Sequence, residues 1–100
     1  MTTRFRDLSP SGMRARALRV YCGYESQKNF AEKFLKVVSP GRWGNVERGN
    51  IPFSFRLIKI IKKKVPAIDT EWLRDGNEDK MPVGMLRELK AIMAKLSAEP

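Results

Sequence analysis

Residues 26–49 constrain the fold more than any other part of the chain, because they predict two short helices joined by a tight connection. Ser26 suits the first residue before a helix, since its hydroxyl can accept a hydrogen bond from a free amide of the first turn. Phe30, Ala31 and Phe34 then recur on one helical face. We therefore expect a helical pair around which the rest of the chain is organised.

The second helix of this pair has different residues on its two sides. Ser39 and Pro40 are typical of a helix start, because serine caps the helix and a first-turn proline needs no N–H. The inner side holds Trp43, Val46 and Glu47, the outer side holds Gly41, Arg42, Asn45 and Arg48, and Gly49 ends the helix. A helix with an apolar inner face and a polar outer face can pack on the protein and enter a DNA major groove, where Arg can bind guanine and Asn can bind adenine. The same spacing also occurs on helices whose outer face is simply solvated.

Basic charge is concentrated around this helical pair. The 100 residues include 20 Lys or Arg and 11 Asp or Glu, which gives a net charge of +9. Residues 1–64 carry fifteen of the basic and four of the acidic residues, whereas residues 65–100 are slightly acidic. A folded basic half predicts a polyanionic partner, nucleic acid first and an anionic membrane second. The basic helices lack a wide apolar face, which argues against membrane binding.

The composition excludes several kinds of active site. The chain has no histidine and one cysteine, Cys22, so it has neither a Cys/His metal site nor a His-based catalytic dyad, and we expect no cofactor. The acidic residues are scattered, and we expect no enzyme activity. No apolar run is long enough to span a membrane and no signal peptide opens the chain, so we expect a soluble, cytoplasmic protein. Cys22 is expected in or beside the core.

Start and stop signals place four more helices. The first runs from Ser9-Pro10 to the stop at Gly23, the fourth covers 55–64, a short fifth ends at Gly76, and the last covers 82–96. On the first helix, Arg14 and Arg16 are expected to point away from the inner face. The domain organisation that follows is a flexible arm at 1–8, a helical domain at 9–76, a linker at 77–81, and a C-terminal helix and tail at 82–100.

Part of this pattern resembles the Cro/C1 repressor-type helix-turn-helix family. The resemblance covers roughly residues 12–75 and is carried by Leu18-Arg19, Gly23, Ser26-Gln27, Ala31, Ser39-Pro40, Trp43 and Glu47-Arg48-Gly49. It implies an all-α fold, with a five-helix repressor-like helix-turn-helix domain followed by an amphipathic C-terminal helix. It also implies a DNA-binding transcriptional regulator of phage or mobile-element type, a repressor in the simplest case. Such a protein acts as a homodimer on double-stranded DNA.

The resemblance also implies roles for single residues. We expect base contacts from the recognition helix, 39–48, through Gly41, Arg42 and Asn45. Backbone contacts are expected from Gln27, Lys28, Lys36, Arg48, Lys62 and Lys63, although the lysines of 62–64 are equally compatible with a solvated charge run. Arg19 and Glu47 are expected to form a structural ion pair, and a carboxylate beside an inner face needs such a partner.

Three features depart from the family pattern. The connection from Phe30 to Ser39 is about two residues longer than in the family, and Leu35 or Lys36 replaces the usual glycine of the turn. The recognition helix also contains Gly41 and Gly44, and each glycine in a helix interior lowers stability by roughly 1 kcal/mol relative to alanine.

The last helix carries an apolar stripe. Met85, Leu89, Ile92 and Leu96 follow a 4-3-4 spacing, with Leu86 and Met93 alongside. The stripe either folds back over the helical core or pairs with a second chain, and we expect it to form a dimer or partner surface. In the alternative function that this surface suggests, the protein does not bind DNA and is an adaptor or antiactivator that binds another transcription regulator.

Overall fold

The computed structural model describes residues 10–98, and every regular element within that range is a helix. The elements are α1 (Pro10–Tyr21), α2 (Gln27–Asn29), the π-helix η2 (Phe30–Leu35), α3 (Pro40–Glu47), α4 (Phe55–Lys64), α5 (Thr70–Asp75) and α6 (Val83–Ala98). The all-helical class predicted from the sequence is confirmed. The arm expected at 1–8 lies outside the described residues.

Side-chain caps start the helices where the sequence predicts. The hydroxyls of Ser26, Ser39 and Ser54 each accept a hydrogen bond of 3.1 Å from a backbone amide three residues later. Asp69 caps α5 in the same way, since its carboxylate accepts from the amide of Trp72 at 3.1 Å. These caps satisfy amides that have no partner within their own helix.

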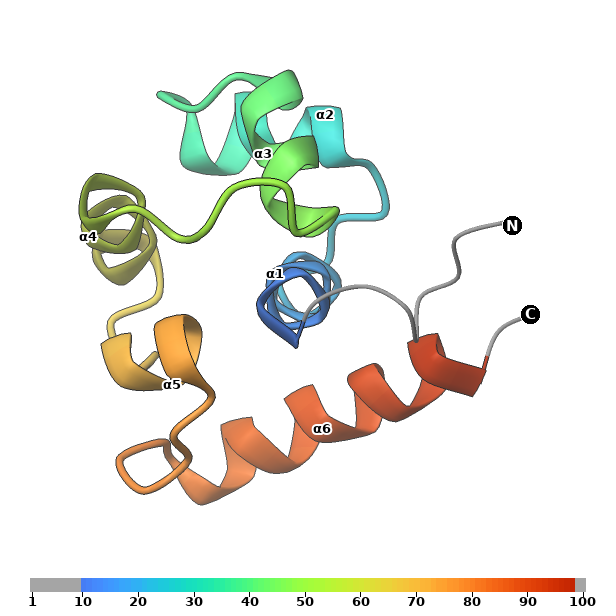
Figure 1. Cartoon of the computed structure of the whole chain (residues 1–100), viewed down its shortest axis with the longest axis vertical. Helices are drawn as coiled ribbons and strands as arrows, with labels where there is room; N and C mark the ends of the chain where they lie inside the picture. The colour runs from blue at the N-terminus through green and yellow to red at the C-terminus, as the bar shows by residue number, and fades with distance from the viewer. Residues whose placement is uncertain (1–9, 99–100) are drawn as a thin grey trace.

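Helix α1 lies at the centre of the molecule. Figure 1 shows it end-on, with α2 and α3 on one side, α6 on the opposite side, and α4 and α5 along the flank. The fully buried side chains around it come from every one of these layers and include Leu18, Phe30, Leu35, Trp43, Ile61, Trp72, Leu73 and Leu89. One continuous core therefore joins the basic and the acidic halves of the chain.

The backbones of α1 and α3 come unusually close at Gly12. A Cβ atom on this glycine would lie 2.5 Å from the carbonyl oxygen of Glu47 and 3.1 Å from the amide nitrogen of Gly49. Real Cβ atoms do not approach backbone oxygen this closely, so the crossing of α1 and the end of α3 requires a glycine at this position.

The connection between α2 and α3 is irregular at the place where the sequence departs from the family pattern. The amide of Lys36 donates to the carbonyl of Ala31 at 2.7 Å, which closes the last turn of the π-helix. Lys36 then has a φ of 71° and a ψ of −38°. The amide of Val37 donates to the carbonyl of Leu35 at 2.8 Å, so Lys36 is the central residue of a γ-turn, which is a strained conformation.

Helix α6 folds back over the core. Met85 and Leu89 are 8% and 0% exposed and belong to the same hydrophobic cluster as the α1 residues. The expectation that these two residues form a dimer or partner surface is therefore wrong, because both are covered by their own chain. The other residues of the stripe, Leu86, Ile92, Met93 and Leu96, are half-buried.

Arg14 is also placed differently from the expectation, because it points inward and is 8% exposed. Its Nε donates to the carbonyl of Leu73 and its Nη2 to the carbonyl of Arg74, both at 3.1 Å. These carbonyls lie at the end of α5, where a cation is favoured by the helix dipole. Burial lowers the pKa of Arg14, and the nearby carboxylate of Asp75 opposes this effect.

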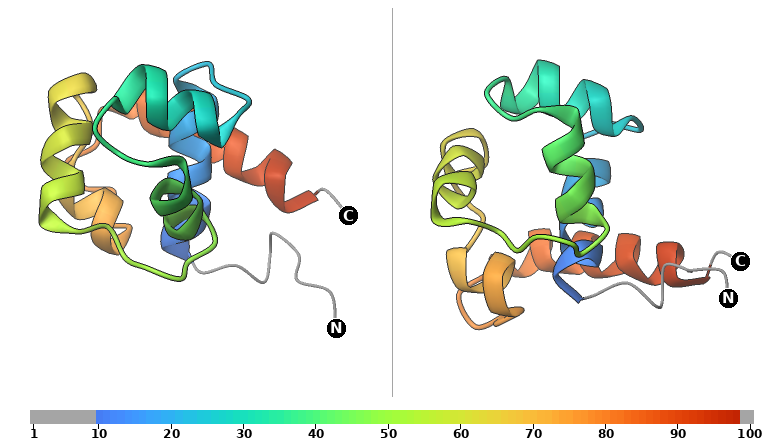
Figure 2. Two further views of the ribbon diagram at one scale, coloured as in Figure 1. Left: turned by 90° about the horizontal axis from the view of Figure 1, so that it is seen from above. Right: turned by 45° about the horizontal axis from the view of Figure 1, so that its top comes forward.

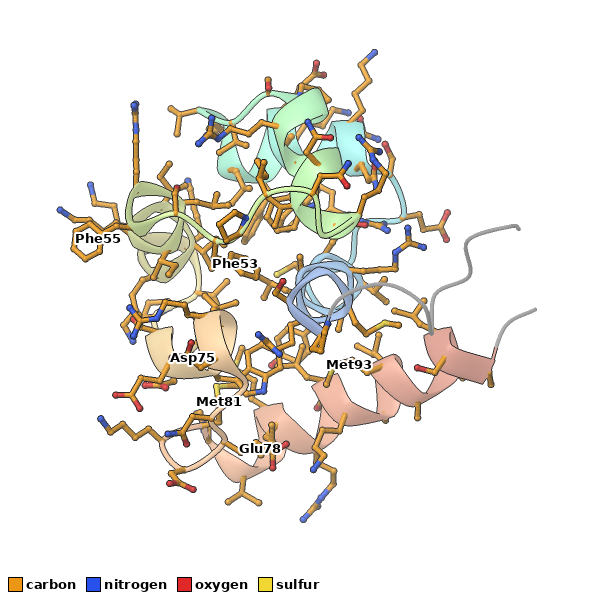
Figure 3. All side chains as sticks on the ribbon, in the orientation of Figure 1. Phe53, Phe55, Asp75, Glu78, Met81 and Met93 are labelled. Atoms are coloured by element: carbon orange, nitrogen blue, oxygen red, sulfur yellow. The ribbon has the colours of Figure 1, made fainter. Side chains whose placement is uncertain are left out.

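A methionine fixes the segment between α5 and α6. Met81 is buried, and its sulfur accepts a hydrogen bond of 3.3 Å from the amide of Asp69. Figure 3 shows Met81 beside α5 and Met93 further along α6, below the end of α1. Residues 77–81, which were expected to be a linker, are thus attached to the core through Met81.

Candidate nucleic-acid interface

Glu47 holds the inner side of α3 against the rest of the protein. Its carboxylate is fully buried, and Oε2 accepts from Nε of Arg19 at 2.6 Å and from the indole nitrogen of Trp43 at 2.5 Å. Oε1 accepts from Nε2 of Gln27 at 3.0 Å and lies 3.4 Å from Nε of Arg16. Arg19 and Glu47, which were expected to pair, are therefore in direct contact. The buried charge is neutralised, and α3 is tied to both α1 and α2.

An aromatic cluster packs beneath the same helix. The ring of Trp43 lies 4.8 Å from that of Phe30 and 6.5 Å from that of Phe53, centroid to centroid. Phe34 stacks on Phe30 at 5.2 Å, and Tyr24 meets both phenylalanines at 5.6 Å. Aromatic pairs at such distances add to the energy of burial. The aromatic cluster thus supports the inner face of α3 at Trp43.

The outer side of α3 is polar and open to solvent. Gly41, Arg42 and Arg48 are exposed and Asn45 is half-buried. Nη2 of Arg48 donates to Oδ1 of Asn45 at 2.9 Å, and Nδ2 of Asn50 donates to the same oxygen at 3.4 Å. Asn50 was not expected from the sequence, and the only signal for it is a polar residue directly after the stop at Gly49.

Gly44 allows two long side chains to lie across α3. A Cβ atom at this position would be 3.1 Å from Nη1 of Arg48 and 3.1 Å from Oε1 of Gln27. The start of α2 and the end of α3 are therefore joined into one surface. We call this surface the α3 polar face; it comprises Gln27, Gly41, Arg42, Gly44, Asn45, Arg48 and Asn50.

The remaining predicted phosphate contacts are dispersed. Lys28, Lys36 and Lys63 are exposed on α2, in the γ-turn and on α4. Lys62 has a different role, because its ammonium donates to the carbonyl of Ile68 at 2.6 Å and to that of Pro66 at 3.2 Å. The prediction of a DNA contact for Lys62 is corrected accordingly, since these hydrogen bonds use its side chain to close the loop between α4 and α5.

The C-terminal helix leaves the α3 polar face uncovered. Figures 1 and 2 show α1 between α3 and α6, so that α6 packs on the side of α1 away from α3. An extended polyanion can therefore approach α3 without displacing any element of residues 10–98. The region that was predicted to read DNA is accessible in the folded chain.

Three further features bear on the chemistry open to residues 10–98: metal ligands, helix length and the single thiol. Within residues 10–98, no three His, Cys, Asp or Glu side chains are grouped as a metal site would require. None of the helices in this range has the length and apolar character needed to cross a membrane. Cys22 is half-buried, and burial raises the pKa of its thiol to about 11, so the thiolate that a nucleophile needs is disfavoured.

Comparison with known protein families, with curated proteins and with solved structures finds no match to this chain. The function proposed below therefore rests on the residues and the geometry of this molecule.

Proposed function

We propose that this protein is a sequence-specific DNA-binding regulator of transcription, in which α2, the γ-turn and α3 act as a helix-turn-helix unit and α3 is the recognition helix. One observation supports this more than any other: α3 is anchored from beneath by Glu47 and Trp43 while its outer side is polar, exposed and free of acidic side chains. A rigid helix with such an outer face can be inserted into a groove as a unit.

The dimensions of α3 fit this role. An α-helix with its side chains is about 10–12 Å across, which matches the width of the DNA major groove of about 12 Å. The eight residues of α3 would extend along the groove for roughly 12 Å, at 1.5 Å per residue. Gly41 presents bare backbone at the exposed start of the helix, where a Cβ atom would meet nothing within 4 Å in the free protein. This position allows close approach of the helix to the edges of the bases.

The side chains then divide into two groups. Arg42 and Asn45 would contact bases, and Arg48, Gln27 and Lys28 would contact phosphates on either side. In the free protein, Arg48 holds the carboxamide of Asn45 through a hydrogen bond of 2.9 Å. On DNA, Arg48 would turn to a phosphate and leave the carboxamide of Asn45 to pair with adenine. Binding would release counterions and weaken steeply with salt.

We also propose that the regulator acts as a symmetric dimer. The distal half of α6 extends past α1 in Figure 1, and its half-buried Ile92, Met93 and Leu96 are the residues of the stripe that a second chain could still cover. A two-fold axis there would allow two α3 helices to occupy successive major grooves, about 34 Å apart. Sedimentation equilibrium tests this assembly: wild type is expected to dimerise and Leu96→Asp to remain monomeric, whereas a monomeric wild type would refute it.

Two measurements test whether the protein reads DNA sequence. Binding sites are first selected from short duplexes with a randomised core, and the affinity for the selected duplex is then measured by fluorescence anisotropy over a series of salt concentrations. Arg42→Ala and Asn45→Ala should each lower affinity for the selected duplex by about 1–3 kcal/mol and relax its sequence preference. Arg48→Ala should weaken binding to all duplexes alike and reduce the slope of log affinity against log salt concentration by about 1. Arg87→Ala, which removes an exposed arginine from α6, is the matched control. No selection of a sequence, or equal losses in the control, would refute the proposal.

A further inference from the structure

A groove with an apolar floor runs along α4 and is unused by the proposed DNA contacts, apart from Arg42 at one end and Lys63, a predicted phosphate contact, at the other cavity. Two cavities of about 330 Å³ and about 470 Å³ share Arg56 and Ile60 in their lining, so they adjoin each other. We call them together the α4 groove. Its apolar lining consists of Val37, Val38, Leu57 and Ile60, which come from both the γ-turn region and α4.

One residue of the groove lining, Val37, and one residue beside the lining, Phe55, expose apolar side chains to water. Val37 is 68% exposed and Phe55 is 75% exposed. Figure 3 shows Phe55 pointing away from the body of the protein, whereas Phe53, two residues earlier, points into it. The ammonium of Lys59, a residue of the groove lining, lies 5.5 Å from the centre of the Phe55 ring. An exposed apolar side chain in a groove, with a second one beside the lining, is typical of a surface that binds a partner.

The rim of the α4 groove is entirely cationic. No acidic residue lines either cavity. The charged lining residues are Arg42, Arg56, Lys59, Lys62 and Lys63. Helices α3 and α4 also begin here, at Ser39 and Ser54, so both present the positive ends of their dipoles. The groove thus offers apolar contact area inside a positive potential.

We propose that the α4 groove binds an acidic segment of another protein that carries apolar anchor side chains. Such a segment would neutralise the cationic rim, bury Val37 and Ile60 in the groove, and extend over Phe55 beside it. Duplex DNA matches the charge only, because phosphates gain nothing from an apolar floor. This proposal concerns a surface and a partner that are separate from reading DNA with α3, and it can hold whether or not the chain binds DNA.

A second copy of this chain is a poorer occupant. The excess positive charge of each copy lies in residues 1–64, which include this groove, so two copies placed groove to groove repel one another. Three of the acidic side chains in the α5–α6 region already have partners in the same chain: Glu71 contacts Lys80 at 3.2 Å, Glu78 contacts Lys90 at 3.1 Å, and Asp75 contacts Arg74 at 3.4 Å. An acidic partner whose charges are not already paired would fit better.

The probe is a synthetic peptide that forms an amphipathic helix, with Leu and Phe along one face and Glu elsewhere. Amide chemical shifts of the full chain, followed by NMR, should change at Val37, Phe55 and Ile60 and stay unchanged at Val83 on α6. Two control peptides are a scrambled sequence of the same composition and an oligoglutamate of the same length. If either control binds as tightly as the probe, binding is merely electrostatic and the proposal fails.

Substitutions at exposed positions show which residues carry the binding. Phe55→Ser and Arg56→Glu should each lower the affinity for the probe peptide about tenfold, as expected of an interface anchor. Val83→Ser and Arg87→Glu are the matched controls, since Val83 is 73% exposed and Arg87 is exposed on α6, and they should bind as wild type does. All four variants should unfold at the wild-type temperature, because these side chains pack little.

Three results would overturn the proposal. The first is wild-type affinity of Phe55→Ser for the probe peptide. The second is a titration with duplex DNA that shifts the amides of Phe55 and Ile60 while the peptide does not, which would make the groove a nucleic-acid surface. The third is a shift of the same amides on simple dilution, which would assign the groove to a second copy of the chain.

Discussion

The guanidinium of Arg19 on α1 and the carboxylate of Glu47 at the end of α3 form a buried ion pair, with Nε and Oε2 2.6 Å apart. The two residues are 28 positions apart in the sequence, and the pair fixes how α3 crosses α1. The same carboxylate accepts from Trp43 and Gln27, so a single side chain orients the helix that we propose reads DNA.

Replacing Glu47 by Gln should lower the free energy of unfolding by about 3–5 kcal/mol, because Arg19 would be left as a buried charge without its counter-ion. Urea unfolding monitored by circular dichroism measures this. The control is Glu71→Gln, which breaks an exposed ion pair with Lys80 and should change stability by less than about 1 kcal/mol. Equal effects of the two substitutions would show that the Glu47 cluster does not support the fold.

Replacing Lys36 by Gly should stabilise the protein by about 1 kcal/mol, because Lys36 has a φ of 71°, which glycine adopts without strain. Lys36→Ala removes the same charge and keeps the strain, so it should give no gain. The difference between the two variants in thermal unfolding isolates the contribution of the γ-turn. A gain in Lys36→Ala as large as in Lys36→Gly would assign the effect to charge.

Replacing Gly12 by Ala should destabilise the protein by about 1–3 kcal/mol, since the new methyl group would lie 2.5 Å from the carbonyl oxygen of Glu47. Gly84 in α6 is the control, because a Cβ atom there meets nothing within 4 Å. Gly84→Ala should raise stability by up to about 1 kcal/mol through helix propensity. Chemical denaturation of both variants measures the contrast, and a stable Gly12→Ala protein would contradict the close crossing of α1 and α3.

Cys22 should make stability fall with rising pH in the alkaline range. Burial raises the pKa of its thiol from 9.0 to about 11, so the unfolded chain loses this proton first. The contribution is fully present below pH 9 and is lost as the pH rises through about 11. Cys22→Ala should lack this component, so the difference in unfolding free energy between wild type and Cys22→Ala should change across that window. A difference that stays constant from pH 8 upward would contradict the burial of the thiol.

Local signals predict much of this fold. The capping serines and the apolar spacing gave the position of α4 at 55–64 and the inner face of α3, because both depend on residues within one or two turns. The contact of Arg19 with Glu47 is the pair that the family resemblance implies, and the need for a partner beside Glu47 follows from a carboxylate on an inner face.

Features that depend on distant backbone atoms could not be predicted. Arg14 is buried because the carbonyls of Leu73 and Arg74 lie beside it, about 60 residues later in the chain. Lys62 donates to the carbonyls of Pro66 and Ile68, which are only four and six residues later but lie in a loop whose path the sequence pattern does not predict. The only signal for the γ-turn at Lys36 was the absence of the usual glycine. The apolar pattern of α6 does not distinguish a helix that packs on α1 of its own chain from a helix that pairs with a second chain.

The most direct test of DNA reading by α3 is the affinity of Gly41→Ala for the selected duplex, compared with that of Gly84→Ala. Both glycines are the second residue of an exposed helix start, and neither Cβ atom would meet protein within 4 Å, so both variants should fold. Only at position 41 would the methyl group separate the helix from the bases. We predict a loss of affinity of about tenfold, equivalent to about 1.4 kcal/mol, for Gly41→Ala and none for Gly84→Ala. Wild-type affinity of Gly41→Ala would contradict the account.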